Sequence, residues 1–130
     1  MQIKSFLFAT LCLLTVAACH KHDDTDTIAP VLTITSPAAD ASIAGAVAIT
    51  GAVTDESLHE LLITVTKDSD GSVLFVPAVD PEVHDLTSYV INETWTPVGI
   101  TAETAVTLTV TAEDHNSNKV VKTVKFKVKP

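Results

Sequence analysis

The chain has 130 residues, with 8 lysines, no arginine, 16 acidic residues and a formal net charge of −8 at pH 7. Such an acidic chain is a poor partner for nucleic acid and for anionic membrane surfaces, because phosphate binding depends on lysine and arginine. The lack of arginine also removes the side chain that best grips phosphate or carboxylate groups through paired hydrogen bonds. We therefore predict no nucleic-acid partner.

The N-terminal segment has the pattern of a secretory signal. Lys4 gives it a positive start, and residues 6–18 carry no charge. This apolar segment is shorter than the roughly 20 residues that a membrane-spanning helix needs. Small residues follow it, as they do before a signal cleavage site. We therefore predict a signal peptide over residues 1–18.

The residues Val16-Ala17-Ala18-Cys19 resemble the lipobox of bacterial lipoproteins. The resemblance implies cleavage before Cys19, a diacylglycerol on its sulfur and a third acyl chain on its new amino group. Two or more acyl chains hold a protein stably on a bilayer. The alternatives are an ordinary signal peptide followed by a free thiol, and an uncleaved anchor. With Cys12 removed and Cys19 lipidated, no cysteine would remain for a disulfide.

The next residues, "HKHDD" from His20 to Asp24, form a charged linker, which we assign with Cys19 to residues 19–28. A lysine followed by acidic residues resembles the surface-export signal of Bacteroidota lipoproteins, although His22 interrupts it. The resemblance implies display on the outer face of the outer membrane; the periplasmic face is the alternative. His20 and His22 would chelate a metal only as alternate residues of an extended chain, and a solvated linker is the simpler interpretation. Asp26-Thr27-Ile28 resembles an O-glycosylation motif of the same bacteria, which implies Thr27 as its acceptor.

From Val31 onward, apolar residues alternate with polar ones at a period of two, which predicts strands and no helix. Many of the outward positions are threonine or lysine, as in a half-buried antiparallel sheet. The predicted strands are Val31–Thr35, Ala46–Thr54, Leu61–Thr66, Val73–Val76, Thr87–Trp95, Val106–Ala112 and Val124–Val128.

Two details of these strands are irregular. Val121 and Val124 cannot share one face of a regular strand, which predicts a β-bulge near Lys122. Glu93 has the same parity as Tyr89 and Ile91, which predicts that its strand twists outward or ends before Trp95. We expect Tyr89 and Trp95 to pack in the core and not to form a platform for sugars.

Seven short strands separated by turns predict an all-β fold, a Greek-key sandwich of antiparallel strands without a disulfide. The stretches "APVLTITSPAADASIAGAVAITGAVTDES" and "AVTLTVTAEDHNSNKVVKTVKFKV" resemble a bacterial immunoglobulin-like domain, over residues 29–128. Single-domain lipoproteins of Bacteroidota carry such domains. The chain departs from antibody domains in lacking their cysteine pair, and from the bacterial pattern in having Ser117 where glycine is usual. We place the domain at residues 29–130.

In an immunoglobulin-like order, the start of the first strand and two loops meet at one pole. Carboxylate and amide oxygens are the ligands that calcium prefers. The predicted pole would supply such oxygens, and distantly similar cadherin-like domains bind calcium there, but between two consecutive domains. The alternative is ordinary turn chemistry, in which Asp and Asn bond their own backbone. The candidate calcium ligands are Asp26, Asp55, Glu56, Asp114, Asn116 and Asn118; no other cofactor is predicted.

Two further sets of polar residues are candidates for binding. His59 and His115 lie near the same predicted pole, where Asp55 or Asp114 would complete a zinc site, although solvent-facing histidines are the default. The segment between the fourth and fifth predicted strands is a candidate ligand-contact loop, since loops on rigid sandwiches carry binding; a plain crossover loop is the alternative. Its polar residues are Asp80, Glu82, His84 and Asp85.

The sequence has none of the motifs that indicate catalysis: no Gly-rich phosphate loop, no G-x-S-x-G elbow and no H-E-x-x-H pair. We therefore expect a non-catalytic binding module, tethered to the outer membrane by lipid, with a protein or a glycan as its partner. The alternative is a structural spacer or assembly factor on the periplasmic side that has no soluble ligand.

Overall fold

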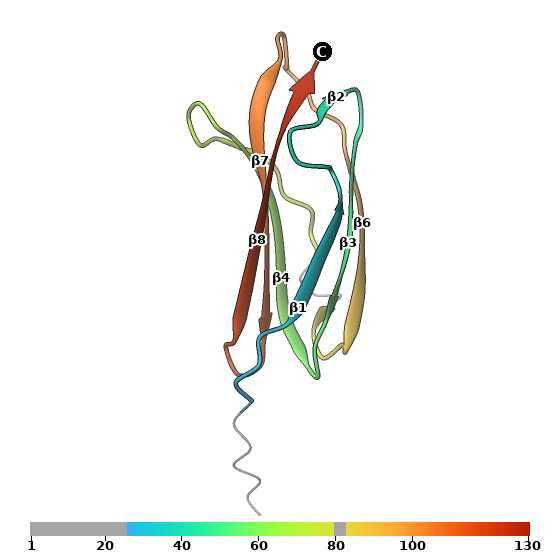
Figure 1. Ribbon diagram of the computed structural model, residues 1–130, viewed down its shortest axis with the longest axis vertical. Helices are drawn as coiled ribbons and strands as arrows, with labels where there is room; N and C mark the ends of the chain where they lie inside the picture. The colour runs from blue at the N-terminus through green and yellow to red at the C-terminus, as the bar shows by residue number, and fades with distance from the viewer. Residues whose placement is uncertain (1–25, 80–82) are drawn as a thin grey trace, which may run out of the picture.

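The computed structural model describes residues 26–79 and 83–130. Over these residues the protein is all-β, and two sheets pack face to face in an immunoglobulin-like sandwich, as predicted (Figure 1). The strands are β1 (Val31–Ser36), β2 (Ser42–Ala44), β3 (Val47–Thr54), β4 (Leu58–Lys67), β5 (Val73–Phe75), β6 (Ser88–Trp95), β7 (Thr104–Asp114) and β8 (Lys119–Lys129). The predictions for the signal peptide, Cys19, Asp80 and Glu82 lie outside the described residues.

The sheet order is that of a Greek key. One sheet has the order β1-β3-β6 and the other the order β2-β8-β7-β4-β5. The chain therefore crosses between the sheets after β1, β2, β3, β5 and β6. All neighbours are antiparallel except β2 and β8, which run parallel. Crossings of this kind bring loops from both sheets to the same ends of the sandwich.

The core consists of the inward residues of both sheets. On β3 these are Val47, Ile49 and Val53, which are almost completely buried, while their neighbours Ala48 and Thr54 are exposed. The described core runs from Leu32 to Val128 without a cysteine. It therefore lies wholly within the predicted domain and is held by packing alone. A chain that begins at residue 20 keeps all of this core.

The two largest aromatic side chains point inward, as predicted. Trp95 is 5% exposed and stacks on Phe75, with their ring centroids 6.2 Å apart. Tyr89 is half-buried against the core. β6 runs through Trp95, as the predicted strand Thr87–Trp95 does, so of the two alternatives given for Glu93 the early end of the strand is excluded. Glu93 keeps its inward parity but is only half-buried, opposite Ile49.

Three other strand predictions need correction. The short strand β2 was missed, because a three-residue strand has too few positions to show a period. β4 begins at Leu58, three residues before the predicted start. The predicted bulge near Lys122 was wrong: β7 and β8 pair in unbroken register, and Val121 points outward with 54% of its surface exposed. The β4–β7 register is shifted instead between Leu58 and Glu60.

Within the residues described, no helix is long and apolar enough to cross a membrane.

Candidate functional site

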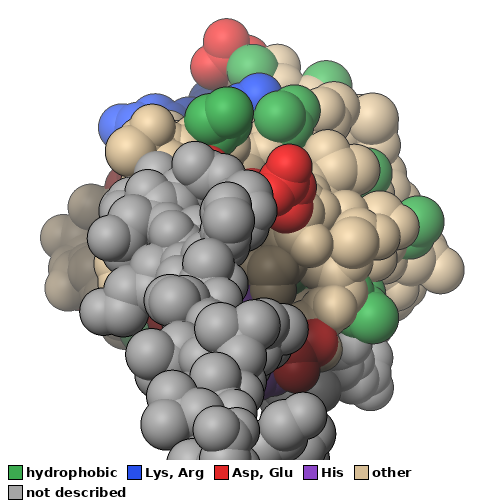
Figure 2. Space-filling view, turned by 90° about the horizontal axis from the view of Figure 1, so that it is seen from below, with side chains coloured by type: hydrophobic (Ala, Val, Ile, Leu, Met, Phe, Trp, Pro, Cys, Tyr) green, Lys and Arg blue, Asp and Glu red, His purple; other side chains and the backbone are tan. Residues whose placement is uncertain are grey.

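The pole predicted from the strand order exists, at the lower end of the sandwich in Figure 1, where the described chain begins. The start of β1, the β3–β4 loop and the β7–β8 turn meet there. The Asn118 side-chain amide joins two of these segments, because its Nδ2 donates to the Asp26 carbonyl oxygen at 2.9 Å and to Asp114 Oδ2 at 2.7 Å. Figure 2 looks onto this end and shows several acidic side chains.

Three of the predicted calcium ligands come together here. Carboxylate oxygens of Asp26, Asp55 and Asp114, which we call the acidic cluster, lie within 4.8 Å of one another. The same residues also make the local bonds expected from turn chemistry. Asp26 Oδ1 accepts from the Ile28 amide at 2.8 Å, and Asp55 Oδ1 accepts from the Ser57 amide at 2.9 Å. The geometry is compatible with both interpretations, and calcium stays a prediction.

Asp114 is the buried member of the cluster, with 1% of its surface exposed. Its Oδ1 accepts hydrogen bonds from the backbone amides of Asn116 and Asn118, both at 2.8 Å. Burial opposes ionisation of this carboxyl, but the hydrogen bonds from Asn118 and Asn116 outweigh it and hold its pKa below the usual value. The ionised carboxylate is therefore the centre that shapes the β7–β8 turn. Ser117 takes a positive φ of 66° in this turn, a conformation that glycine adopts without strain.

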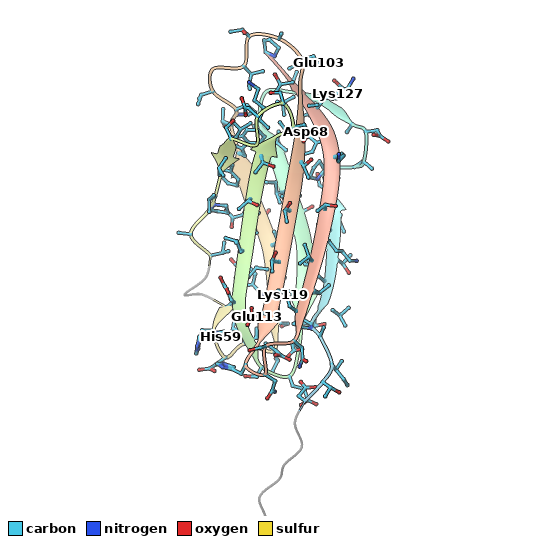
Figure 3. All side chains as sticks on the ribbon, turned by 90° about the vertical axis from the view of Figure 1, so that its left-hand side faces the viewer. His59, Asp68, Glu103, Glu113, Lys119 and Lys127 are labelled. Atoms are coloured by element: carbon cyan, nitrogen blue, oxygen red, sulfur yellow. The ribbon has the colours of Figure 1, made fainter. Side chains whose placement is uncertain are left out.

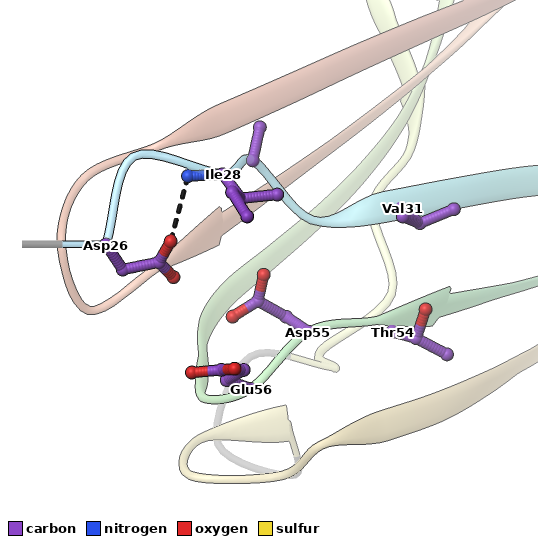
Figure 4. A pocket seen from close by; sticks show the side chains of 7 residues that line it. Asp26, Ile28, Val31, Thr54, Asp55 and Glu56 are labelled. Carbon is purple, nitrogen blue, oxygen red and sulfur yellow. Dashed lines mark hydrogen bonds between the residues drawn. The ribbon is translucent and has the colours of Figure 1, made fainter.

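An open hollow of about 320 Å³ adjoins the acidic cluster (Figure 4). Asp26, Asp55 and Glu56 form its polar side, and the exposed side chains of Ile28 and Val31 form its apolar side. Glu56, a predicted ligand, thus lies at the hollow, while Asn116 contacts Asp114 through its backbone. A small ligand with one cationic and one apolar part would fit these walls.

A second cluster at the pole consists of histidines. The rings of His59, His84 and His115, which we call the histidine cluster, have centroids 4.7 to 5.1 Å apart. One ring nitrogen from each lies within 4.8 Å of the others. The side chains of His84 and His115 are 48% and 35% exposed. Figure 3 shows His59 at the lower end of β4.

The backbone positions these histidines from three separate segments. His59 is the extra residue at the register shift of β4, since Leu58 pairs with Asp114 and Glu60 pairs with Glu113. Such bulges turn a side chain away from its regular direction and are common next to functional sites. His84 precedes β6 and His115 follows β7. His59, at the start of β4, thus lies next to both the segment that carries His84 and the segment that carries His115.

Asp85 lies against two of the three rings. Its carboxylate accepts a hydrogen bond from His115 Nε2 at 2.8 Å, and its other oxygen lies 3.2 Å from His84 Nδ1. The hydrogen bond from His115, followed by that from His84, holds the pKa of Asp85 below its usual value. The backbone of Asp85 has a positive φ of 65°, a conformation that aspartate adopts more readily than most residues.

The sequence placed His59 and His115 at one pole but did not find their partners. Asp55 and Asp114, proposed to complete a zinc site with them, belong to the acidic cluster instead. The partners are His84 and Asp85, which had been assigned to a separate ligand-contact loop. Val83 gave a usable signal, because an apolar residue amid polar ones indicates an inward anchor. It is fully buried and draws the loop onto the pole.

The outer face of the β1-β3-β6 sheet carries no charge, although 18% of the chain's residues are charged. We call it the uncharged face. Its outward side chains are Val31, Thr33, Thr35, Ala48, Thr50, Ala52, Thr54, Ser88, Val90, Asn92 and Thr94. Val31 and Val90 are 65% and 74% exposed. The outer face of the other sheet, by contrast, carries ions such as the Glu113–Lys119 pair, 2.7 Å apart (Figure 3).

Two modification sites were also predicted, at Thr27 and at Cys19. Thr27, the predicted O-glycosylation acceptor, is exposed just before β1. The lipidation site Cys19 lies outside the described residues. Both stay predictions.

No family model matches the chain, and no curated protein matches it. Among solved structures, the chain is similar to the crystal structure of CopC from Methylosinus trichosporium OB3b, with 14% identity, over 78% of this chain and 94% of that chain. The TM-score is 0.46. At this distance the likeness carries no inference about ligands or activity.

Proposed function

We propose that the protein is a lipid-anchored, non-catalytic binding module of the bacterial outer membrane, displayed on the cell surface. Its role is to hold a protein partner against the uncharged face. A periplasmic spacer without a partner is the alternative.

The observation that carries this proposal is the uncharged face. Charged residues are depleted in the centres of protein interfaces, because burying an unpaired charge is costly. A spacer in contact with water alone has no reason to keep one whole sheet face free of charge. The face has no aromatic side chain, since Tyr89 and Trp95 point inward. This favours a protein over a glycan, because sugars are usually bound on aromatic platforms.

The proposed tether would present this face sideways. Six residues lie between Cys19 and Asp26, and the seven steps from one residue to the next span at most about 25 Å. The pole with the two clusters would therefore lie close to the membrane. The strands run along the long axis of the sandwich, away from the pole (Figure 1). Both sheet faces would then stand upright and accessible to a neighbouring protein.

Site-specific photo-cross-linking in living cells tests the binding role. A photoreactive amino acid at Asn92, on the uncharged face, is expected to give a discrete cross-linked product on irradiation. The matched control places the same amino acid at Thr109, on the outer face of the other sheet. The product should disappear when Val90→Lys puts a charge on the uncharged face. Equal products from both positions, or none, would favour the spacer.

Protease treatment of intact cells tests the location separately. A tag after Pro130 lies at the end of the sandwich opposite the pole (Figure 1). We expect a protease that cannot cross the outer membrane to remove this tag while a periplasmic control protein survives. Survival of the tag until the cells are lysed would place the domain in the periplasm, and the search for partners would move there.

A further inference from the structure

We propose that the histidine cluster, supported by Asp85, is a binding site for a divalent transition-metal ion of the zinc and copper class. The proposal concerns the folded domain alone and does not depend on the lipid anchor or on the uncharged face.

The donor atoms are close enough for one ion. Imidazole nitrogens bind zinc at 2.0–2.1 Å, so two donors of a tetrahedral site lie roughly 3.4 Å apart. One nitrogen each of His59, His84 and His115 already lies within 4.8 Å of the others. Closing the remaining distance requires a shift of about 1.4 Å at most, within reach of side-chain rotations at rings that contact solvent.

The backbone holds the three segments together before any ion arrives. Leu58, next to His59, donates to the Leu86 carbonyl at 2.9 Å and accepts from the Asp85 amide at 2.8 Å. The amide of His115 donates to the Ser57 carbonyl at 3.3 Å. The buried side chain of Val83 anchors the segment that carries His84. An ion would therefore order side chains only, which lowers the entropic cost of binding.

We assign to Asp85 the role that carboxylates play around metal-bound histidines. Such histidines almost always give their second ring nitrogen to a carboxylate, a carbonyl or water, which fixes the ring and makes it a better ligand. Asp85 contacts both His84 and His115. This arrangement, together with the bulge that turns His59 toward the other two, distinguishes the cluster from histidines that meet by chance on a surface.

The chemistry of the donors selects the ion. Imidazole nitrogens suit zinc, copper and nickel, whereas calcium and magnesium prefer oxygens. The acidic cluster at the same pole, which offers only oxygens, therefore suits calcium or magnesium better than this class of metal. Three histidines leave one position of a tetrahedral site for water or another ligand. The net charge of −8 also favours the approach of a cation.

Titration of residues 20–130 with Zn²⁺, followed by calorimetry, tests the proposal. We expect saturable binding of one ion per chain and a higher melting temperature with Zn²⁺ present. His59→Gln or His115→Gln should weaken binding at least about tenfold, and Asp85→Asn about 10- to 100-fold. Cu²⁺ should bind at the same site, with an electron paramagnetic resonance spectrum that shows coordinated imidazole nitrogens. Melting without metal confirms that each variant is folded.

Two control variants separate this site from its neighbours. His20→Gln with His22→Gln removes the histidines of the linker, and Asp26→Asn alters the acidic cluster; both should leave the Zn²⁺ affinity unchanged. The proposal is overturned if neither Zn²⁺ nor Cu²⁺ binds saturably. It is also overturned if binding survives the loss of His59 and His115 and disappears with His20 and His22.

Discussion

Asp114→Ala is expected to lower the free energy of unfolding by about 3 kcal/mol, because it leaves three partly buried donors without this acceptor. The carboxylate accepts the backbone amides of Asn116 and Asn118 and the side-chain amide of Asn118. Each unsatisfied buried donor costs about 1–3 kcal/mol, and the loosened turn will recover part of this by admitting water. Chemical denaturation followed by circular dichroism measures the loss.

Asp70→Ala is the matched control for this variant. Asp70 also organises a turn, since it accepts from the backbone amide and the hydroxyl of Ser72 and lies 3.6 Å from Lys67. Its side chain is 54% exposed, however, so water can replace the lost bonds. We expect a much smaller loss for Asp70→Ala than for Asp114→Ala. Equal losses of unfolding free energy in Asp114→Ala and Asp70→Ala would contradict the view that Asp114 stabilises the fold because it is buried.

Asp114→Ala is also expected to affect the proposed metal site. Asp114 precedes His115 directly, and the turn that it shapes positions the His115 backbone against Ser57. Even where the domain remains folded, Asp114→Ala should therefore weaken Zn²⁺ binding, whereas Asp70→Ala, at the other end of β4, should not. The pair of variants thus tests how firmly the pole is held by one buried carboxylate.

The strands could be predicted from the sequence because each sheet has one solvent-exposed face and one buried face. On β7, Val106, Leu108 and Val110 are fully buried, while Thr107 and Thr109 between them remain partly exposed. This alternation is a local property and needs no knowledge of the partner strands. The prediction of strands failed where pairing with a neighbouring strand decides whether a segment is a strand and which way its side chains point. β2 is a strand only because it lies beside β8, and Val121 is outward only because β8 keeps its register with β7.

The candidate site was predictable in part for the same reason. Strand order alone brought Asp26, Asp55 and Asp114 to one pole, since it depends on the fold and not on side-chain detail. The histidine cluster depends on two structural features that the alternation of apolar and polar residues does not reveal. One is the shift of register that turns His59, and the other is the inward anchor at Val83, which carries His84 toward His115.

Gly51→Ala is expected to lower the free energy of unfolding by about 2–3 kcal/mol, because a methyl group at this position has no room. Gly51 lies in the middle of β3, opposite Ile34 of β1. A Cβ atom added there would collide with the carbonyl oxygen of Thr33, and its next neighbours are also backbone atoms of β1. No side-chain rotation relieves a collision with backbone, so β1 would have to move away from β3.

Hydrogen exchange measures where this loss falls. β1 is an edge strand of its sheet, so we expect its amides to lose protection first in Gly51→Ala, while those of β4 and β7 keep theirs. The control is Ala52→Val, whose added methyl groups point outward and should change stability by less than about 0.5 kcal/mol. A uniform loss of protection in both sheets would mean that β1 cannot move by itself.

Gly51→Ala also separates the two proposed binding functions, that of the uncharged face and that of the metal site. β1 contributes Val31, Thr33 and Thr35 to the uncharged face, while the histidine cluster depends on β4, on the segment before β6 and on the β7–β8 turn. In Gly51→Ala, cross-linking from the uncharged face should therefore fail under conditions where Zn²⁺ still binds. If both were lost together while the β4 and β7 amides stayed protected, the face and the metal site would have to be parts of one binding surface.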